Sequence, residues 1–547
     1  MTPAPGNETP PVVALSPNEP GTSMTGARSL IRTLVHAKVD VCFANPGTSE
    51  MHFVAALDAV PEMRAVLALF EGVVTGAADG YGRMTGRPAA TLLHLGPGLG
   101  NGIANLHNAR RARTPIVNIV GEHAIYHQRF DAPLQSDIVA LASNVSKWIR
   151  VCASSDDLAA DATDAVAAAM GPPGGIATLV VPADVSWGTV AGRAARRRPV
   201  PPIGSVPADT IESMRKVVAS GEPVVILLGG RALRERGLRA ATTIAGATGA
   251  TLFAETFPAR LERGGDLPPI ERLAYLGEMA IGQLTSARHI ILVDAAAPVS
   301  FFAYPGQPSE LWPTGCELHA LAGPGHDVAG ALEALAASVR PSWSSARGGT
   351  SVRPAPSFAR PTGPLTSESL AAAIACVLPE GAVVVDESNT AGVFLSGATE
   401  GAPRHDWLCN TGGAIGQGLP VATGAAIGAP DRPVICIQAD GSAMYTLQAL
   451  WAQAREGLDV TTVILSNRAY AILNLELARV GAGAGGPLAR RLLELSSPDL
   501  DFVALAQGMG VPAARATTAE ELVVHLERAL HEPGPHLVEA VLPIGFG

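Results

Sequence analysis

Uninterrupted apolar runs that end at turn residues such as Gly, Asp or Asn recur throughout this chain of 547 residues. Between these runs, apolar residues return at helical spacing, as at Leu30, Ile31, Leu34 and Val35. Strands that are apolar on both faces and alternate with helices are typical of parallel sheets covered by helices on both sides. We therefore predict a doubly wound α/β protein. The runs are ATLLHLGPG, PIVNIVGE, ATLVVPAD, PVVILLGG, HIILVDAAAP, AVVVDESN, PVICIQADG, VTTVILSN and HLVEAVLP.

Two stretches interrupt this alternation, AGRAARRRPVPPIGSVP and RPSWSSARGGTSVRPAPSFARPTGP. Both are rich in Pro, Gly, Ser or Arg, as linkers are. A Pro-rich N-terminal stretch without the basic start and apolar core of a signal peptide predicts a disordered tail. The predicted organisation is a tail (1–23), a first α/β domain (24–190), a linker (191–207), a central α/β domain (208–339), a second linker (340–364) and a third α/β domain (365–547).

The composition excludes several classes of protein. With 47% apolar residues and only 16% charged residues, the chain is not intrinsically disordered. The net charge of −10 and the absence of a basic stripe speak against a nucleic-acid partner. No apolar run reaches the roughly 18 residues of a membrane span, so we expect no membrane partner. Six scattered cysteines without a Cys-x-x-Cys pair favour the cytoplasm.

The segment RPVICIQADGSAMYTLQALWAQAREGLDVTTVILSNRAYAIL is typical of a complete βαβ unit. One strand ends at Asp440, the next ends at Asn467, and Gly457 is the expected C-cap of the helix between them. The apolar face predicted for that helix comprises Met444, Leu447, Trp451 and Ala454.

A right-handed crossover brings the ends of both strands to the same edge of the sheet, where open α/β sheets bind ligands. A carboxylate and an amide oxygen therefore converge there. With a loop carbonyl and phosphate oxygens they would suit Mg²⁺, which prefers octahedral oxygen ligands. Taken alone, Asp440-Gly441 could equally be an ordinary turn in which Asp440 or Ser442 caps a helix.

This segment resembles the fingerprint of thiamine diphosphate (ThDP)-dependent enzymes, Gly-Asp-Gly followed after about 24 to 27 residues by Asn-Asn. The chain has Ala439-Asp440-Gly441, then 24 residues, then Ser466-Asn467. Ala439 and Ser466 depart from the pattern, but neither position is a metal ligand in the family. The resemblance implies that Asp440 and Asn467 bind Mg²⁺ through side-chain oxygens and Ala469 through its carbonyl.

A second match surrounds Glu71, in LALFEGVVTGAADGYGRMTGRPA. It resembles the family pattern in which a Glu hydrogen-bonds N1′ of the cofactor's aminopyrimidine and activates C2. The alternative is a carboxylate on a half-exposed helix face. Since Glu71 and Asp440 fall in different domains, the resemblance implies a cofactor that bridges two subunits. It therefore implies a homodimer or a dimer of dimers with pyrimidine-binding, central and diphosphate-binding domains.

The resemblance covers about residues 24–547 and is closest to acetolactate synthase large subunits and to benzoylformate decarboxylase. It places Thr48 in the active-site loop, and His94 at a catalytic histidine that could instead be an ordinary strand-end residue. Ala303 lies near the place of a second family histidine, which puts simple decarboxylation in doubt. Four further positions fall near substrate or acceptor sites, although Glu476 could be solvated and Lys147 a surface residue: Gln135, Lys147, Ile472 and Glu476.

The segment CNTGGAIGQGLPVATGAAIG resembles the one that holds ThDP in its bent conformation. Ile415 would sit under the bend, and the Gly413 carbonyl would bond the 4′-amino group. Four residues are assigned to the diphosphate side of the cofactor: Asn389, Thr390, Gly441 and Ser442.

The resemblance thus implies ThDP- and Mg²⁺-dependent decarboxylation of a 2-keto acid with carboligation, as when two pyruvates give acetolactate and CO₂. A decarboxylase that releases an aldehyde is the alternative. A nucleotide-binding oxidoreductase is less favoured, because the glycines of LHLGPGLGNG lack G-x-G-x-x-G spacing. A non-catalytic homologue is less favoured because Glu71, Asp440 and Asn467 are all present. Acetolactate synthases also carry FAD, but the family's arginine-rich flavin contacts are not identifiable here, so FAD is the less favoured option.

Overall fold

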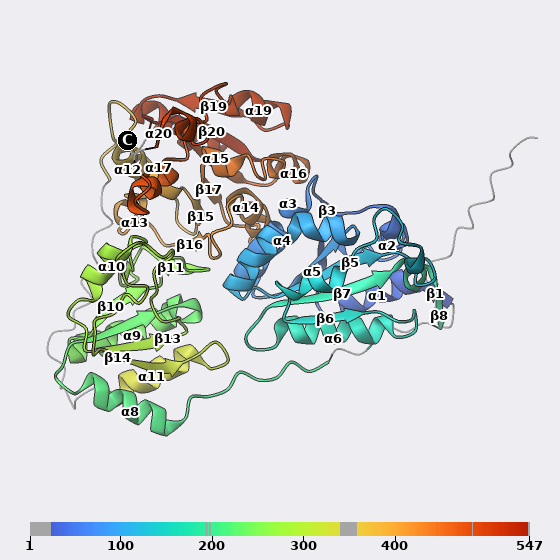
Figure 1. Ribbon diagram of the computed structural model, residues 1–547, viewed down its shortest axis with the longest axis horizontal. Helices are drawn as coiled ribbons and strands as arrows, with labels where there is room; N and C mark the ends of the chain where they lie inside the picture. Colours follow the sequence, from blue (N-terminus) through green and yellow to red (C-terminus); the bar gives the residue numbers. More distant parts are fainter. Residues whose placement is uncertain (1–22, 192–194, 196–197, 340–357, 484, 545–547) are drawn as a thin grey trace, which may run out of the picture.

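The computed structural model describes residues 23–191, 195, 198–339, 358–483 and 485–544, which fold around three large sheets (Figure 1). The predicted α/β architecture is confirmed, because each large sheet is entirely or mainly parallel. Most of the predicted tail, and residues 340–357 of the second predicted linker, lie outside the described residues. The predicted domain boundaries remain predictions.

The first sheet is fully parallel, with the strand order β3-β2-β4-β5-β7-β6. A short antiparallel pair, β1 and β8, joins the two ends of this region. The strands are β1 (Ser23–Thr25), β2 (Val41–Asn45), β3 (Arg64–Leu67), β4 (Ala89–Leu93), β5 (Ile116–Glu122), β6 (Trp148–Val151), β7 (Ile176–Pro182) and β8 (Thr189–Ala191). The helices are α1 (Gly26–His36), η1 (Thr48–Glu50), α2 (Met51–Leu57), α3 (Glu71–Thr85), α4 (Leu95–Ala112), η2 (Gln128–Phe130), α5 (Ile138–Ser143), α6 (Leu158–Met170) and α7 (Ala183–Trp187).

The second sheet is also parallel, with the order β12-β10-β9-β13-β14. Its strands are β9 (Val224–Leu228), β10 (Thr251–Ala254), β12 (Glu271–Arg272), β13 (His289–Val293) and β14 (Glu317–Ala322). The helices of this region are α8 (Ala208–Val218), η3 (Gly230–Leu233), α9 (Glu235–Thr248), α10 (Gly277–Leu284) and α11 (Val328–Val339).

The third sheet has the order β11-β16-β15-β17-β18-β20-β19. Its strands are β11 (Leu261–Arg263), β15 (Val383–Glu387), β16 (His405–Cys409), β17 (Val434–Ala439), β18 (Val460–Ser466), β19 (Ala513–Ala516) and β20 (His536–Val541). The helices are α12 (Ser367–Val377), η4 (Asn389–Gly392), α13 (Leu395–Ala398), α14 (Gly418–Gly428), α15 (Asp440–Ala443), α16 (Ala449–Glu456), α17 (Ala471–Arg479), α18 (Pro487–Arg491), α19 (Phe502–Gly508) and α20 (Ala519–His531).

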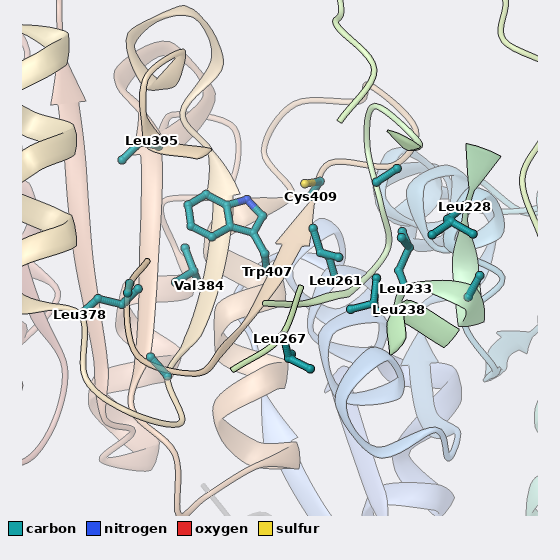
Figure 2. Packing of buried hydrophobic residues seen from close by; sticks show 14 of the residues in the cluster. Leu228, Leu233, Leu238, Leu261, Leu267, Leu378, Val384, Leu395, Trp407 and Cys409 are labelled. Atoms are coloured by element: carbon teal, nitrogen blue, oxygen red, sulfur yellow. The ribbon is translucent and has the colours of Figure 1, made fainter. Parts of the chain in front are cut away.

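Strand β11 comes from the central segment but pairs antiparallel with β16 at the edge of the third sheet. Leu261 lies opposite the fully buried Trp407, and one continuous apolar cluster runs from the central segment into the third sheet. Figure 2 shows Leu228, Leu233 and Leu261 on one side of this cluster and Trp407 with Val384 on the other. The two regions therefore share a core.

The helix predicted after Asp440 is divided. Residues 444–448 form turns between α15 and α16, and the Met444 side chain is exposed rather than on the buried face. Thr446 Oγ1 donates to the Gly416 carbonyl at 2.8 Å, so a contact with the glycine-rich loop interrupts the helix. Gly457 does end α16 in the left-handed conformation, with φ of 61°, as predicted.

Two further observations concern membrane-spanning helices and the state of the cysteines. None of the helices in the described ranges is both long and apolar enough to cross a membrane. All six cysteines are free thiols, and burial raises the pKa of Cys42 and Cys409 to about 12.

Candidate active site

A pocket opens at the carboxyl ends of β15, β17 and β18, the adjacent parallel strands at the centre of the third sheet. Ala439 pairs with Leu465, so Asp440 and Asn467 emerge at the same edge, as predicted from the chain. Ser388 and Tyr470 also line the pocket. The pocket brings together eight of the predicted site residues: Asn389, Thr390, Asp440, Gly441, Ser442, Asn467, Ala469 and Ile472.

Asp440 is buried and is held by backbone donors. Its Oδ1 accepts from the Gly441 N–H at 2.7 Å, and its Oδ2 accepts from the Arg468 N–H at 2.6 Å. Burial raises the pKa of Asp440 to about 6, although these hydrogen bonds oppose the shift. A nearby cation would favour the charged carboxylate, so the site is chemically suited to a metal ion.

The other pocket residues supply oxygens and close backbone. The Asn467 amide oxygen accepts from the Ala469 N–H at 3.2 Å, and Asn389 Nδ2 donates to Ser442 Oγ at 2.9 Å. A Cβ at Gly441 would lie 2.4 Å from the Tyr470 ring, so only glycine fits there. Carboxylate, amide and carbonyl oxygens in one pocket form the ligand set that Mg²⁺ prefers.

The glycine-rich loop before α14 is fixed by a buried carboxylate that the sequence analysis missed. Glu387 accepts from the N–H groups of Gly416 and Gly418, at 2.8 and 2.6 Å, and from Gln438 Nε2 at 2.9 Å. Burial raises the pKa of Glu387. Glu387 ends strand β15, so the sheet itself positions the loop.

Gly413 and Ile415 lie in this loop, outside the pocket lining. Gly413 has φ of +76°, and a Cβ there would lie 2.8 Å from the ring of Phe301, in the central segment. Phe301 lies two residues before Ala303 in the sequence and packs edge-on against Phe257. An aromatic ring thus stands over the residue that is predicted to contact the cofactor's amino group.

Glu71 is the first residue of α3 and is buried in the first sheet region. Its Oε2 accepts from Asn101 Nδ2, on α4, at 3.0 Å, and Gly98 lies close to its other oxygen. Glu71 is not among the residues that line the strand-end pocket. The two halves of the predicted site therefore lie on different sheets of one chain.

His94 immediately precedes α4 and pairs with a second buried acid. Its Nδ1 lies 2.8 Å from Glu50 Oε2, which also accepts from the Gly47 N–H at 2.8 Å. Burial raises the pKa of Glu50, although His94 opposes the shift. Thr48, exposed, lies in the same loop.

Gln135 lies in the loop before α5, and this loop meets the start of α4. A Cβ at Gly96 would collide with Ser136 Oγ, the neighbour of Gln135, which places the loop close to His94. Lys147 lies elsewhere, donating to the carbonyls of Gly171 and Pro173 at 2.9 and 2.6 Å. Its ammonium group therefore stabilises the turn at residues 171–173.

Ile472 and Glu476 share α17 but have different surroundings. Ile472 lines the strand-end pocket, whereas Glu476 lies 3.6 Å from Arg479 and faces Tyr304 of the central segment. Arg479 lies over the Tyr304 ring at 4.3 Å and pairs with Glu278 at 2.9 Å. Glu476 therefore belongs to a contact between α17 and the central segment.

Asp79 and Arg83 of the Glu71 motif tie the first and third sheet regions together. They form a buried ion pair at 2.6 Å, and Arg83 Nη1 donates to the Cys409 carbonyl at 2.7 Å. Helix α3 also packs on α14. The motif thus fixes α3 against the segment that leads into the glycine-rich loop.

The carboxyl edge of the central sheet is filled by side chains. Arg113, from the end of α4, pairs with Asp294 at 2.6 Å, and Asp294 also accepts from the Arg231 N–H at 2.8 Å. Glu255 accepts from the Gly230 N–H at 2.9 Å, and burial raises the pKa of Glu255 to about 7. This is the edge at which a dinucleotide would bind in an open α/β sheet.

Glu50, Glu387, Asn101 and Phe301 were not predicted. Glu387 ends the apolar run AVVVDE, which is a usable signal, whereas Glu50 lies in the polar loop NPGTSE and gave none. Asn101 and Phe301 gave none, since each acts through a partner distant in sequence.

Two protein-family profiles match the chain: the thiamine pyrophosphate enzyme N-terminal TPP binding domain over residues 24–143, and the C-terminal TPP binding domain over residues 395–540. A Mycobacterium tuberculosis protein named "Putative acetolactate synthase large subunit IlvX" is 58% identical over 521 residues, covering 95% of this chain and 99% of that protein. The benzoylformate decarboxylase of Pseudomonas aeruginosa is 30% identical, covering 91% and 95%. Among solved structures, the ThDP-dependent 4-hydroxybenzoylformate decarboxylase of Rhodococcus jostii RHA1 has a TM-score of 0.82 at 26% identity, covering 96% and 100%.

Proposed function

The chain belongs to the thiamine diphosphate-dependent enzymes, and on this premise we propose that it decarboxylates a 2-keto acid and joins the acyl unit to a second carbonyl compound. Acetolactate formation from two pyruvates is the reference reaction. The similarity to the mycobacterial protein with the acetolactate synthase name supports this choice. The structural observation that carries it is the Phe301 ring beside Gly413, in the loop where an aldehyde-releasing relative is expected to offer a second histidine.

Mg²⁺ and the cofactor diphosphate are proposed to bind in the strand-end pocket. Asp440, Asn467 and the Ala469 carbonyl would hold the metal. Asn389, Thr390, Gly441 and Ser442 would face the phosphates. The oxygen-rich lining and the lack of a side chain at Gly441 support this assignment.

When bound, ThDP supplies a nucleophilic carbon and accepts the electron pair that CO₂ leaves behind. Glu71 is proposed to share a proton with the pyrimidine ring, and Asn101 fixes the carboxylate for that task. Gly413 and Ile415 are proposed to hold the ring side of the cofactor. Thr48, Gln135, Ile472 and Glu476 are proposed substrate-side residues, of which Ile472 has direct access to the pocket.

The assembly is proposed to be a homodimer or a dimer of dimers. Glu71 lies outside the pocket that contains Asp440, although the proposed chemistry needs both at one cofactor. A second copy of the chain would supply the missing half. We further propose ThDP as the only organic cofactor, because Arg113 and Asp294 fill the carboxyl edge of the central sheet. The six free thiols support a cytoplasmic location.

Non-oxidative decarboxylation with aldehyde release is the second candidate, and the Glu50–His94 pair favours it. A histidine held by a buried carboxylate is a competent proton donor. Release of an aldehyde needs a proton on the carbon that lost CO₂, whereas ligation bonds that carbon to a second carbonyl and places the proton on the acceptor oxygen.

Product analysis distinguishes the two functions. With ThDP, Mg²⁺ and pyruvate alone, acetolactate should exceed acetaldehyde, and a panel of larger 2-keto acids defines the donor. His94→Gln should leave the ligation product dominant, and His531→Gln, at an exposed position, is the control. Acetaldehyde or another aldehyde as the dominant product would establish the decarboxylase instead.

A further inference from the structure

A cluster of two histidines and two glutamates lies at the amino-terminal edge of the central sheet. His289 begins β13, Glu317 begins β14, and Glu222 lies just before β9. The candidate active site lies at the carboxyl ends of the third sheet. The cluster is therefore separate from the proposed ThDP site.

The strand register brings the ligand atoms together. His289 pairs with Glu317 across β13 and β14, and His319 follows Glu317 by two residues, so Glu317 and His319 project from the same face of β14. His289 Nδ1 and His319 Nε2 are 3.1 Å apart, and Glu317 Oε2 lies 3.7 Å from each of them. Ligands bound to a tetrahedral ion at about 2.0–2.1 Å lie about 3.3 Å from one another, so these three atoms nearly match one face of such a tetrahedron.

Glu222 contacts His289 on the side of the ring that is turned away from Glu317 and His319. Its Oε2 lies 2.8 Å from His289 Nε2, the ring nitrogen that faces away from the cluster centre. A histidine that donates Nε2–H to a carboxylate presents the Nδ1 lone pair, and metal-ligating histidines commonly have such a partner. The two rings are inclined at 45° with centroids 5.2 Å apart, so their nitrogens converge while their faces do not stack.

The two histidines of the cluster are largely buried and its two glutamates are exposed, so an ion can enter from solution. The imidazoles are largely buried, whereas the Glu317 and Glu222 side chains are 69% and 52% exposed. Glu317 is therefore free to move the few tenths of an ångström that coordination requires. Burial, followed by the neighbouring His289, lowers the pKa of His319.

We propose that His289, His319 and Glu317 form a binding site for a divalent transition metal of the Zn²⁺ class, with Glu222 orienting His289 and a water completing the coordination. Two nitrogens and one carboxylate oxygen favour such ions over Mg²⁺, which prefers oxygen ligands. The ion would bridge β13 to the edge strand β14 and stabilise the central sheet.

The test is a Co²⁺ titration of the untagged enzyme already loaded with ThDP and Mg²⁺. Four-coordinate Co²⁺ with imidazole ligands has a much stronger visible spectrum than octahedral Co²⁺ among oxygens. We expect one equivalent per chain with the strong spectrum, and a rise in melting temperature with Zn²⁺. His319→Ala should lose both responses, and His531→Ala should keep both.

Two exposed substitutions keep the test independent of folding. Glu317→Gln should weaken Co²⁺ binding, and Glu222→Gln should weaken it about 10- to 100-fold, the usual cost of losing a carboxylate behind a histidine ligand. Unchanged melting in the absence of metal would show that both variants are folded. Co²⁺ binding that His319→Ala and Glu317→Gln leave intact, or no binding at all, would overturn the proposal.

Discussion

Asp440 combines two tasks in one side chain. It accepts backbone hydrogen bonds that shape the turn after β17, and it presents oxygen to the strand-end pocket. We predict that Asp440→Ala leaves the protein folded but lowers Mg²⁺ affinity at least about 100-fold, since even partners behind a ligand cost 10- to 100-fold. Calorimetric titration of Mg²⁺ in the presence of ThDP measures this. Asp431→Ala, at an exposed turn, is the control, and undiminished Mg²⁺ affinity and turnover in Asp440→Ala would contradict the assignment.

Glu71 is held so that one carboxylate oxygen bonds Asn101. A glutamine there keeps the size of the side chain but cannot exchange a proton with the cofactor ring. We expect Glu71→Gln to bind ThDP yet slow deuterium exchange at the cofactor's C2 by about 10²- to 10⁴-fold, the usual contribution of a positioned acid or base. Proton NMR of quenched samples follows the exchange. Glu62→Gln, at an exposed position, serves for comparison, and equal exchange rates in both variants would make Glu71 a structural residue.

The residues that could be predicted from the sequence are those whose chemistry is local. Asp440 and Asn467 follow apolar runs, and the rule that parallel strands end at one edge brings them together. The pairing of His94 with Glu50 could not be deduced in this way, because it depends on how η1 meets α4. The contact between Phe301 and Gly413 joins two different sheet regions, and no pattern in either segment signals it.

At the scale of elements, most buried strands were predictable and the edge strands were not; β16 is buried but has the mixed sequence HDWLC, and no predicted run covers it. β4, β5 and β17 are apolar on both faces and stand out in the sequence. β3, β6 and β14 are half-exposed edge strands with mixed composition, so no continuous apolar run marks them. The interrupted helix after Asp440 has a related cause, because a tertiary hydrogen bond from Thr446 overrides the helical spacing.

Strand β16 gives a pH dependence to the contact with β11. His405 begins β16, is buried against Trp407, and donates from Nδ1 to the Pro403 carbonyl at 2.7 Å. Burial lowers its pKa from 6.5 to about 4, so the unfolded chain takes up a proton before the folded chain does. The stabilisation is therefore fully present above about pH 6.5 and is lost as the pH falls to about 4, a loss of about 3 kcal/mol.

His405→Asn retains a donor for the Pro403 carbonyl and does not titrate. In the wild type, protonation of His405 lowers the free energy of unfolding between about pH 6.5 and 4. We predict that this contribution is absent when the free energy of unfolding of the variant is measured by denaturant titration at the same pH values. His531→Asn, at an exposed site, should unfold with the wild-type pH profile. Parallel profiles for wild type and His405→Asn would disprove the assignment.

At the scale of the whole molecule, the separation of Glu71 from the strand-end pocket predicts complementation between subunits. Asp440→Ala and Glu71→Gln chains should each be inactive alone. A mixed dimer contains one site with both wild-type residues, so the isolated mixed dimer should have about half of wild-type activity and a random mixture of the two chains about a quarter. Co-expression with two purification tags isolates the mixed dimer. Activity that stays at the level of the single variants would place the whole site within one chain.

The pairing of β11 with β16 limits how this protein can be recombined. A segment bounded by the two linkers looks like a module that could be exchanged between relatives. Here that segment contributes the edge strand of the sheet that carries Asp440 and Asn467, and Leu261 packs against Trp407. A chimaera built at the linkers must therefore preserve the fit between Leu261 and Trp407, and exchanging these two regions together is the way to keep it.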